Sequence, residues 1–527
     1  MQLKGFPGRM PELGEPLRVS HDAGARNFSP LRGKRRQLAG EHGHWRGLGE
    51  KRQVSAAYEA GKSGDGKHGE APGGCDVSFR KPDIALAEHC KRSRHVREHR
   101  TFVLHRATSV RLMPEREKAA HLLRRATFGP TMREVDAAEQ RGFEATLQML
   151  VRPSSPDNLS YPRLEPDPYA ALTRQSTREE RQAAQKTRRE QVQQITGWWL
   201  DRMVTAERQL AEKLVFFWHG HWATSVQKVN SAHLMLAQQQ IFRSRAHGPF
   251  GDFVKAMLRD SALILWLDGQ RNTRKAPNEN LARELMELFT LGIGNYTEAD
   301  VKEAARALTG WTIDRTTGVA SLEPNKFDDG QKMILGRTAK FDVDSLADHL
   351  VSQAAAPKFV ASRLWFRFGS AEPIPSSVLE SMSAAGDVAS MMTAMLRSEE
   401  FGRAQGQLVK QPVEWLVGAV RQLGISGDRS AFYKGLTALD QVPFRPPSVA
   451  GWPSGNAWLT TFSAQTRLRV AEALAAKAVT VPSDTDEAAR VLCVDAWTDR
   501  TRKLLEGVKD PRRRLALALA SPEYAVH

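Results

Sequence analysis

The stretch EREKAAHLLRRATFGP, residues 115–130, combines apolar and basic residues at helical spacing and then stops abruptly. Its apolar residues recur three and four positions apart, which is the period of an amphipathic helix. Gly129 and Pro130 end the pattern, because glycine and proline both interrupt helices. Thr131 is then placed to cap a second helix, which we expect to end at Gly142. Short amphipathic helices joined by tight turns are therefore the expected building blocks.

The helical pattern continues along most of the chain. A proline-rich linker at 152–168 precedes a long charged helix near 176–204, whose charged half we interpret as a solvated face with intrahelical ion pairs. Thr297, with an acid three residues later, begins another helix. The remaining predicted helices lie near 207–218, 230–245, 250–267 and 279–291, and again from 344 onward apart from a loop at 443–456.

One region breaks this pattern. Residues 311–337 are rich in Thr, Gly, Asp and β-branched residues, which predicts a short hairpin or two. The sequence contains no internal repeat and no persuasive linker after Pro168. The expected fold is therefore mainly α, a single large multi-helix domain over residues 113–527 with a small β-hairpin insertion near 311–337.

Residues 1–112 differ from the rest in composition. They contain 22 Lys and Arg against 12 Asp and Glu, whereas residues 113–527 contain 54 against 48. No run in this segment has a helix or strand period, so we expect a disordered basic segment. One interpretation is a basic arm for nucleic acid or an anionic surface. We favour a mis-called start, with translation beginning at Met113, and we do not expect nucleic acid as a partner of the patterned domain.

Several classes of protein are disfavoured. No window approaches the ~18 consecutive apolar residues of a membrane-spanning helix. Cys75, Cys90 and Cys493 have neither metal-type spacing nor the number needed for a disulfide framework. Polar residues follow the arginine pair at 35–36 where an export signal needs an apolar stretch, so the default location is the cytoplasm. Phosphate-loop, dinucleotide, serine-hydrolase and zinc-protease motifs are absent from the sequence.

The aromatic segment FFWHGHW, residues 216–222, contains the first candidate site. His219 and His221 point about 200° apart on a continuous helix, so they can face one site only if the helix ends or distorts at Gly220. One interpretation is a pair of metal ligands, or an acid–base histidine beside aromatic walls. The other is a helix end whose imidazoles hydrogen-bond to the backbone, and the spacing alone favours it.

Acidic residues form two further candidates. Glu284 and Glu287 lie on one predicted helical face beside an apolar stripe, where carboxylates are costly to bury unless they are paired or bind a cation. Arg283, four residues before Glu287, offers an ordinary ion pair. Asp328 and Asp329 precede a glycine, which suits a tight turn, and binding of a hard cation is the alternative.

The fourth candidate is the segment VAGWPSGNAW, residues 449–458. Tryptophan and glycine in loops can form stacking platforms for sugars or planar ligands. More often such tryptophans close over a core. The sequence leaves both interpretations open for Trp452 and Trp458.

Taken in order, several segments resemble the bacterial family called domain of unknown function 1800, over nearly all of residues 113–527. The segments that carry the resemblance are HLLRRATFG (121–129), 213–225, 278–292, 304–311, GWP (451–453) and SPEY (521–524). The resemblance implies a large helical protein, often exported, with no established activity. It also implies a partner, since members are commonly encoded beside the sulfatase-like domain of unknown function 1501 family. Two departures are the missing export signal and Phe327, where the resemblance leads us to expect a histidine.

The first of two hypotheses is a metal-dependent, hydrolase-like enzyme. Its divalent metal, Zn, Mn or Fe, activates water. The proposed metal ligands are His219, His221, Glu284 and Glu287, with Asp328 and Asp329 as further candidates. The candidate catalytic residues are Glu284, Glu287, Asn280 and Glu303, the last two of which orient ligands.

The second hypothesis is a non-catalytic helical scaffold that binds a sulfatase-like partner protein. In it the polar clusters are buried structural networks. The two hypotheses differ in one structural expectation. An enzyme requires that the histidines and carboxylates line an open cavity, whereas a scaffold allows them to lie in a sealed core.

Overall fold

The first segment folds as its pattern predicts. Residues Glu115–Ala126 form helix α1, with acidic residues in its first turn and basic residues in its last, which complements the helix dipole. The chain then turns at Gly129, where φ is +106° and a Cβ atom would lie 2.6 Å from the Cα atom of Gly418. Glycine is required here for both reasons. This turn therefore fixes the start of the described chain against a helix almost 300 residues away, as the contact between Gly129 and Gly418 shows.

The computed structural model describes residues 114–527, apart from residues 155–159, 315 and 428. The segment 1–112 that we expect to be disordered lies outside the described residues. All described residues fall within one compact unit, Leu104–His527.

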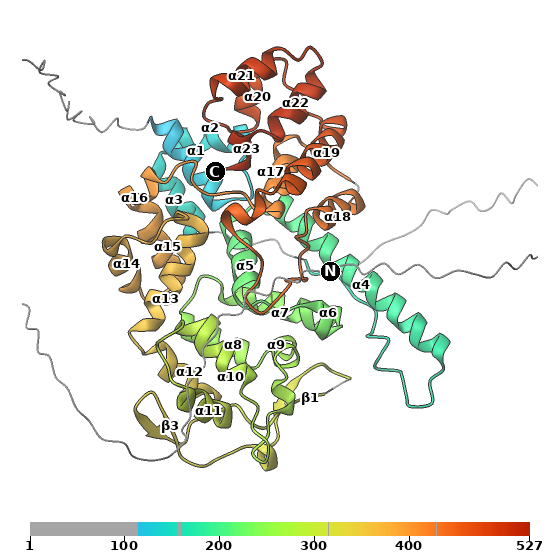
Figure 1. Cartoon of the computed structure of the whole chain (residues 1–527), viewed down its shortest axis with the longest axis vertical. Coiled ribbons are helices and arrows are strands. Elements are labelled where there is room, and N and C mark those ends of the chain that lie inside the picture. The colour runs from blue at the N-terminus through green and yellow to red at the C-terminus, as the bar shows by residue number, and fades with distance from the viewer. Residues whose placement is uncertain (1–113, 155–159, 315, 428) are drawn as a thin grey trace, which may run out of the picture. The chain divides into compact units, whose positions relative to one another are not determined.

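The described residues contain twenty-three α-helices, which confirms the mainly α fold (Figure 1). Up to the hairpins, these elements are α1, α2 (Met132–Arg141), α3 (Phe143–Val151), α4 (Arg178–Thr205), α5 (Gln209–His221), α6 (Val226–Val229), α7 (Ala232–Arg245), α8 (Phe250–Leu258), α9 (Ser261–Trp266), the 3-10 turn η1 (Gly269–Arg271), α10 (Asn280–Glu284), the π-helical turn η2 (Leu285–Thr290) and α11 (Glu298–Ala307). After the hairpins they are α12 (Val343–Val351), α13 (Ala355–Leu364), the π-helical turn η4 (Trp365–Gly369), α14 (Ser376–Ser383), α15 (Val388–Arg397), α16 (Glu399–Arg403), α17 (Pro412–Gln422), α18 (Arg429–Ala438), the 3-10 turn η5 (Gly455–Trp458), α19 (Thr461–Lys477), α20 (Thr485–Val491), α21 (Asp499–Glu506), α22 (Pro511–Leu519) and α23 (Pro522–Ala525).

The predicted helix starts at Thr131 and Thr297 are confirmed. Each threonine hydroxyl oxygen accepts a hydrogen bond from the backbone N–H of the third helical residue, and that residue's carboxylate accepts one from the threonine backbone N–H. The predicted helix at 250–267 is two helices, α8 and α9, because Asp260 caps a new start by accepting a hydrogen bond from the Leu263 amide at 2.8 Å. The helix predicted at 279–291 widens into η2 after one and a half turns.

The predicted β insertion is confirmed as two small antiparallel hairpins. β1 (Trp311–Ile313) pairs with β2 (Ala320–Leu322), and Trp311 lies opposite Leu322. After a 3-10 turn, η3 (Pro324–Lys326), β3 (Lys332–Ile334) pairs with β4 (Arg337–Ala339). The second hairpin runs slightly beyond the expected limit of 337.

Helix α5 is the centre of the main core. Eleven of its thirteen residues are buried, including Trp218, which has no exposed surface. A helix that is apolar on all sides must be surrounded by other elements, and α5 contacts α1, α3, α4 and α7 (Figure 1). The end of α5, with the two candidate histidines, therefore lies inside the fold.

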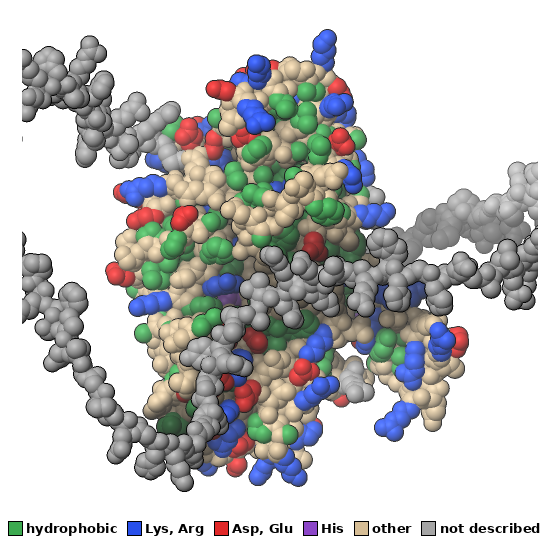
Figure 2. Space-filling model, viewed as in Figure 1, with side chains coloured by type: hydrophobic (Ala, Val, Ile, Leu, Met, Phe, Trp, Pro, Cys, Tyr) green, Lys and Arg blue, Asp and Glu red, His purple; other side chains and the backbone are tan. Residues whose placement is uncertain are grey.

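The surface carries mixed charge. In Figure 2, basic and acidic side chains are interspersed over the face in view. No helix among the described residues is long and apolar enough to cross a membrane.

Candidate functional site

The two candidate histidines lie on different sides of α5. The Nε2 atom of His219 accepts a hydrogen bond from the Phe444 amide at 3.0 Å, and its ring packs against Trp199, Trp452 and Phe444. Burial lowers its pKa to about 3. His219 therefore holds the loop after α18 against the core.

The His221 ring is neutral, and one of its two nitrogen atoms has no hydrogen-bond partner. Its Nε2–H group donates a hydrogen bond to the Phe289 carbonyl at 3.0 Å. This contact leaves the lone pair on Nδ1, which is buried and has no partner. Burial, and then the positive charge of Arg363, lower the pKa of His221 to about 3, against the opposing effect of the Phe289 carbonyl. The backbone interpretation is thus realised for both histidines, but only His221 retains a free acceptor.

His221 lines two neighbouring cavities. The first, called here the small cavity, has a volume of about 190 Å³ and lies between the end of α5, the turn η4 and the segment 450–455. The second, the large cavity, has a volume of about 520 Å³ and lies between η2, α13 and residues 449–450. Three residues line both cavities: His221, Arg363 and Ala450.

Arg363 is the unusual member of this site. It is only partly exposed, and burial lowers its pKa. Its Nε atom is buried and has no partner, and no hydrogen bond or ion pair joins the side chain to any described residue. A guanidinium carries five N–H donors in a planar fork that matches carboxylate and phosphate oxygens. Arg363 therefore presents an unused anion-binding group to both cavities.

A second arginine, Arg367, lines the small cavity one turn further on. Its Nη1 atom donates to Glu414 at 3.0 Å, whereas its Nη2 atom is buried without a partner. Glu414 also forms an ion pair with Lys213 at 2.9 Å. Although burial alone would raise the pKa of Glu414, Arg367 and Lys213 hold it well below the ordinary value. The Glu414 carboxylate therefore pairs with two cations, Arg367 and Lys213.

Two further cations lie close to this pair. Arg125, fully buried, donates to the carbonyls of Gly369 and Ala404, and burial lowers its pKa to about 9. Burial, and then Arg124, lower the pKa of Lys410 to about 7. The described side chains that line the small cavity include two arginines and no Asp or Glu. The electrostatic environment of this cavity is accordingly positive.

Both π-helical turns contribute to these cavities. η2 supplies Glu287 to the large cavity, and η4 supplies Arg367 to the small one. π-helical turns are rare inside helices and occur frequently at functional sites. The presence of two such turns beside adjacent cavities therefore supports a functional site here, independently of the arginine charges.

The segment 449–455 covers the end of α5. Gly451 has φ of +87°, and a Cβ atom on it would lie 2.5 Å from the Gly220 carbonyl oxygen. This backbone contact positions Trp452. Its ring packs against Phe216, with 6.0 Å between the ring centroids, and also lines the small cavity. Trp452 thus covers the core and also forms a wall of the small cavity, while its use as a stacking platform for a ligand stays a prediction.

The structure separates the predicted acidic residues. Glu287 lines the large cavity and accepts a hydrogen bond from the Tyr296 hydroxyl at 2.8 Å. Glu284 does not line either cavity, and burial followed by the charge of Glu287 raises its pKa. The expected ion pair of Arg283 with Glu287 is wrong, because Arg283 pairs with Glu298 at 2.7 Å and with Glu279 at 3.0 Å.

The other predicted site residues have structural partners. Asn280 donates from its side chain to the Leu267 carbonyl at 3.2 Å. Glu303 and Asp328 both pair with Arg306, at 2.7 and 2.8 Å, and the pKa of Asp328 is lowered by that contact. Asp329 is exposed on the turn. The contacts of Glu303 and Asp328 join α11 to the second hairpin, and none of these four residues lines either cavity.

Within the described part of the chain, no group of three or more His, Cys, Asp or Glu side chains is arranged to hold a metal ion. Of the ligands in the first hypothesis, His221 and Glu287 share a cavity, and His219 is committed to the Phe444 amide. The residues that the sequence interpretation missed are Arg363 and Arg367. Their signal is two charges inside the aromatic run SRLWFRFG, residues 362–369, where each would be costly to bury.

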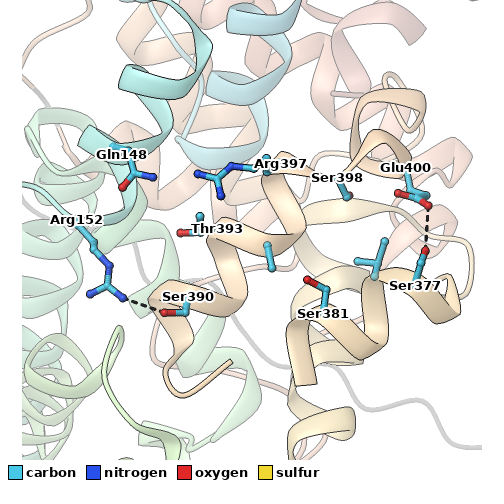
Figure 3. A pocket seen from close by; sticks show the side chains of 11 residues that line it. Gln148, Arg152, Ser377, Ser381, Ser390, Thr393, Arg397, Ser398 and Glu400 are labelled. Atoms are coloured by element: carbon cyan, nitrogen blue, oxygen red, sulfur yellow. Dashed lines mark hydrogen bonds between the residues drawn. The ribbon is translucent and has the colours of Figure 1, made fainter. Parts of the chain in front are cut away.

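A separate hollow lies between α3, α14, α15 and α16 (Figure 3). Its labelled walls are mostly hydroxyl side chains, with Ser377 donating to Glu400 at 3.1 Å. Its two arginines already have acidic partners: Arg152 pairs with Asp387 at 3.1 Å, and Arg397 with Glu144. The hollow thus lacks the unpartnered charge of the two cavities.

Comparison with known families gives one match. The sequence model of the family described as "Protein of unknown function (DUF1800)" matches residues 121–526. Neither the curated proteins nor the solved structures contain a significant match. The match spans the helices that form both cavities, from α5 through η2 and α13 to the segment 449–455. The resemblance of the individual segments is thereby confirmed, and the chain belongs to the DUF1800 family of proteins of unknown function.

Proposed function

We propose that this protein binds a small anionic molecule, a carboxylate or a phosphate, between Arg363 and Arg367. The observation that carries the proposal is the Arg363 side chain, which is only partly exposed, has its Nε atom buried, and has no hydrogen-bond or ion-pair partner among the described residues. An unpaired buried charge lowers stability. Such a cost is typical of binding sites, where the missing partner is the ligand.

The surroundings of Arg363 support an anion over a cation. The small cavity offers the free Nη2 atom of Arg367 as a second donor. The neutral His221 ring adds no negative charge. A metal ion at His221 would lie beside the positive charge that already lowers the pKa of this histidine. The metal-dependent hydrolase predicted from the sequence is therefore less well supported than an anion-binding protein.

The scaffold hypothesis is a separate matter. It concerns a sulfatase-like partner protein, and its support is the family resemblance. An anion-binding cavity is compatible with such a partner and does not depend on it.

The test is calorimetric titration of the full chain with inorganic phosphate and with acetate, at constant ionic strength. We expect one site per chain for at least one of these anions. Arg363→Gln removes charge-assisted hydrogen bonds of about 1.5–3 kcal/mol, so the Kd should rise at least tenfold. Arg363→Lys keeps the charge and loses the planar fork, and it should give an intermediate Kd.

Arg403→Gln is the matched control, since Arg403 is mostly exposed and pairs with Glu399 on α16. It should bind as the wild type does. Arg363→Gln should also unfold at a higher temperature than the unliganded wild type, because it removes an unpaired charge. Wild-type affinity in Arg363→Gln, or no binding of either anion to the wild type, would overturn the proposal.

A further inference from the structure

The large cavity has a different character from the small one. Most of its walls are apolar, and they include Leu288, Phe359 and Val449. Its volume of about 520 Å³ lies within the range of about 300–1,000 Å³ that is usual for small-molecule sites. A phosphate or acetate ion bound at the arginines would leave this space unused.

We propose that the anion is the head of an amphiphile, a carboxylate whose aliphatic chain occupies the large cavity. The inference rests on the proposed function, and it adds the class of ligand. Arg363 lines both cavities, so a carboxylate that pairs with it lies at the entrance to the apolar walls.

Ile293 supports an aliphatic ligand. Its side chain is 81% exposed at the edge of the large cavity, although isoleucine is among the residues most often buried. Its neighbour Gly292 packs against the Phe359 ring, where a Cβ atom would lie 2.9 Å from the ring carbon Cδ2. This close packing holds Ile293 beside the cavity mouth. An aliphatic chain in the cavity would cover part of its exposed surface.

The charged groups that line the large cavity, besides Arg363, are Glu287 and Lys358. Glu287 is engaged by the Tyr296 hydroxyl, and Lys358 is exposed. Arg363, the residue without a hydrogen-bond or ion-pair partner, therefore lies where the two cavities meet. This arrangement, with charge at one end and apolar walls along the other, matches a molecule with one anionic end.

The experiment is a titration of the full chain with acetate, butyrate, hexanoate and octanoate at constant ionic strength. Each added methylene group that leaves water should tighten binding by up to about fourfold, the equivalent of about 0.8 kcal/mol. 1-Octanol, which has the chain without the charge, should bind at least tenfold more weakly than octanoate. This difference should disappear in Arg363→Gln.

Ile293→Asp tests the apolar end with little risk to folding, because the residue is exposed. It should weaken octanoate binding at least tenfold, and by a larger factor than it weakens acetate binding, because the new carboxylate repels both anions but removes apolar contacts only from octanoate. Val479→Asp is the matched control, since Val479 is 75% exposed and lines neither cavity.

The outcomes separate the two proposals. If acetate or phosphate binds and octanoate binds no more tightly than acetate, the amphiphile is wrong and the anion site stands. Equal octanoate affinities in Ile293→Asp and Val479→Asp would also overturn the amphiphile. If none of the anions binds, both proposals fail.

Discussion

A cation that is withdrawn from water without a carboxylate partner costs free energy in the folded state, and neither Arg363 nor Lys410 has an acidic partner among the described residues. Arg363 faces the cavities, whereas Lys410 lies behind them, with its ammonium 3.7 Å from the centre of the Tyr524 ring. No ion pair joins Lys410 to an acid among the described residues. These two residues should therefore respond differently to replacement, one through ligand binding and the other through stability alone.

Lys410→Met should stabilise the protein at pH 7. Replacing buried charges with apolar side chains of similar volume is worth about 1–4 kcal/mol. The folded-state pKa of Lys410, about 7, is below the ordinary value of 10.5, so the unfolded state binds more protons between these values. Wild-type stability should thus rise as the pH increases from 7 toward 10, and this rise should be smaller in the variant.

Denaturant unfolding at pH 7, 8.5 and 10 measures this effect. Lys477→Met, on the exposed side of α19, is the control for the loss of one positive charge. A lower free energy of unfolding in Lys410→Met at pH 7, with an unchanged pH dependence, would contradict the assignment of Lys410 as an unpaired buried cation.

The candidate site was only partly predictable at this scale. His221, Glu287 and the segment at 449–458 all belong to the sequence candidates, and all line the cavities. Arg283 shows why pairing was not predictable, since it pairs with Glu298, fifteen residues away, and with Glu279, rather than with the expected Glu287. Such choices depend on which helices meet, and local spacing carries no information about that.

At the scale of helices and hairpins, more of the structure could be predicted, because short segments of sequence determine these elements. The pattern of α1, the threonine caps and the two hairpins were all predicted from short segments, because each depends on residues a few positions apart. The two π-helical turns were not predicted. A wider turn is maintained by packing around it, here against the end of α5 and the segment 449–455, and the sequence window of one helix does not contain that information.

Gly451→Ala should disturb the segment that covers α5. The left-handed backbone conformation costs a residue with a Cβ atom about 1–2 kcal/mol. The new Cβ atom would also lie 2.5 Å from the Gly220 carbonyl oxygen, so the segment must move. Anion binding should weaken as Ala450 and Trp452 move, and the fluorescence of Trp452 should change.

The comparison variant is Gly406→Ala. Gly406 also has a positive φ, +72°, but a Cβ atom there meets nothing within 4 Å. Gly406→Ala therefore measures the cost of the positive φ alone, without the steric clash that a Cβ atom makes at Gly451. If both variants lose the same free energy of unfolding and bind anions equally well, the contact between Gly451 and Gly220 has no role in forming the site.

At the scale of the whole molecule, the core buries neutral histidines. Burial is the main cause that lowers the pKa of His121, His219 and His221 to about 3. On unfolding these groups recover pKa values near 6.5 and bind protons. Their contribution to stability is therefore complete above pH 6.5 and is lost progressively as the pH falls toward 3.

The wild type should accordingly lose stability as the pH falls from 6.5 to 4. Each histidine contributes up to about 1.4 kcal/mol per pH unit in this range. Asp260 has the opposite effect on stability. Burial raises its pKa to about 6, so the folded state binds its proton more readily than the unfolded state and gains stability from it as the pH falls. His219→Gln retains an acceptor for the Phe444 amide and should reduce the slope of unfolding free energy against pH by about one such increment. An identical slope in the variant would show that His219 does not remain neutral in the fold.

The two π-helical turns have a consequence for comparing relatives. Each turn contains one residue more than an α-helix would need to span the same stretch, and each residue of an α-helix rotates the chain by about 100°. Deleting one residue from 365–369 would shorten this turn and rotate everything beyond it by roughly that angle, so the residues that follow it, Ala371 among them, would meet the small cavity in a different orientation. A one-residue gap in an alignment, at 285–290 or at 365–369, is thus a mark by which members that keep this site can be told from members that have lost it.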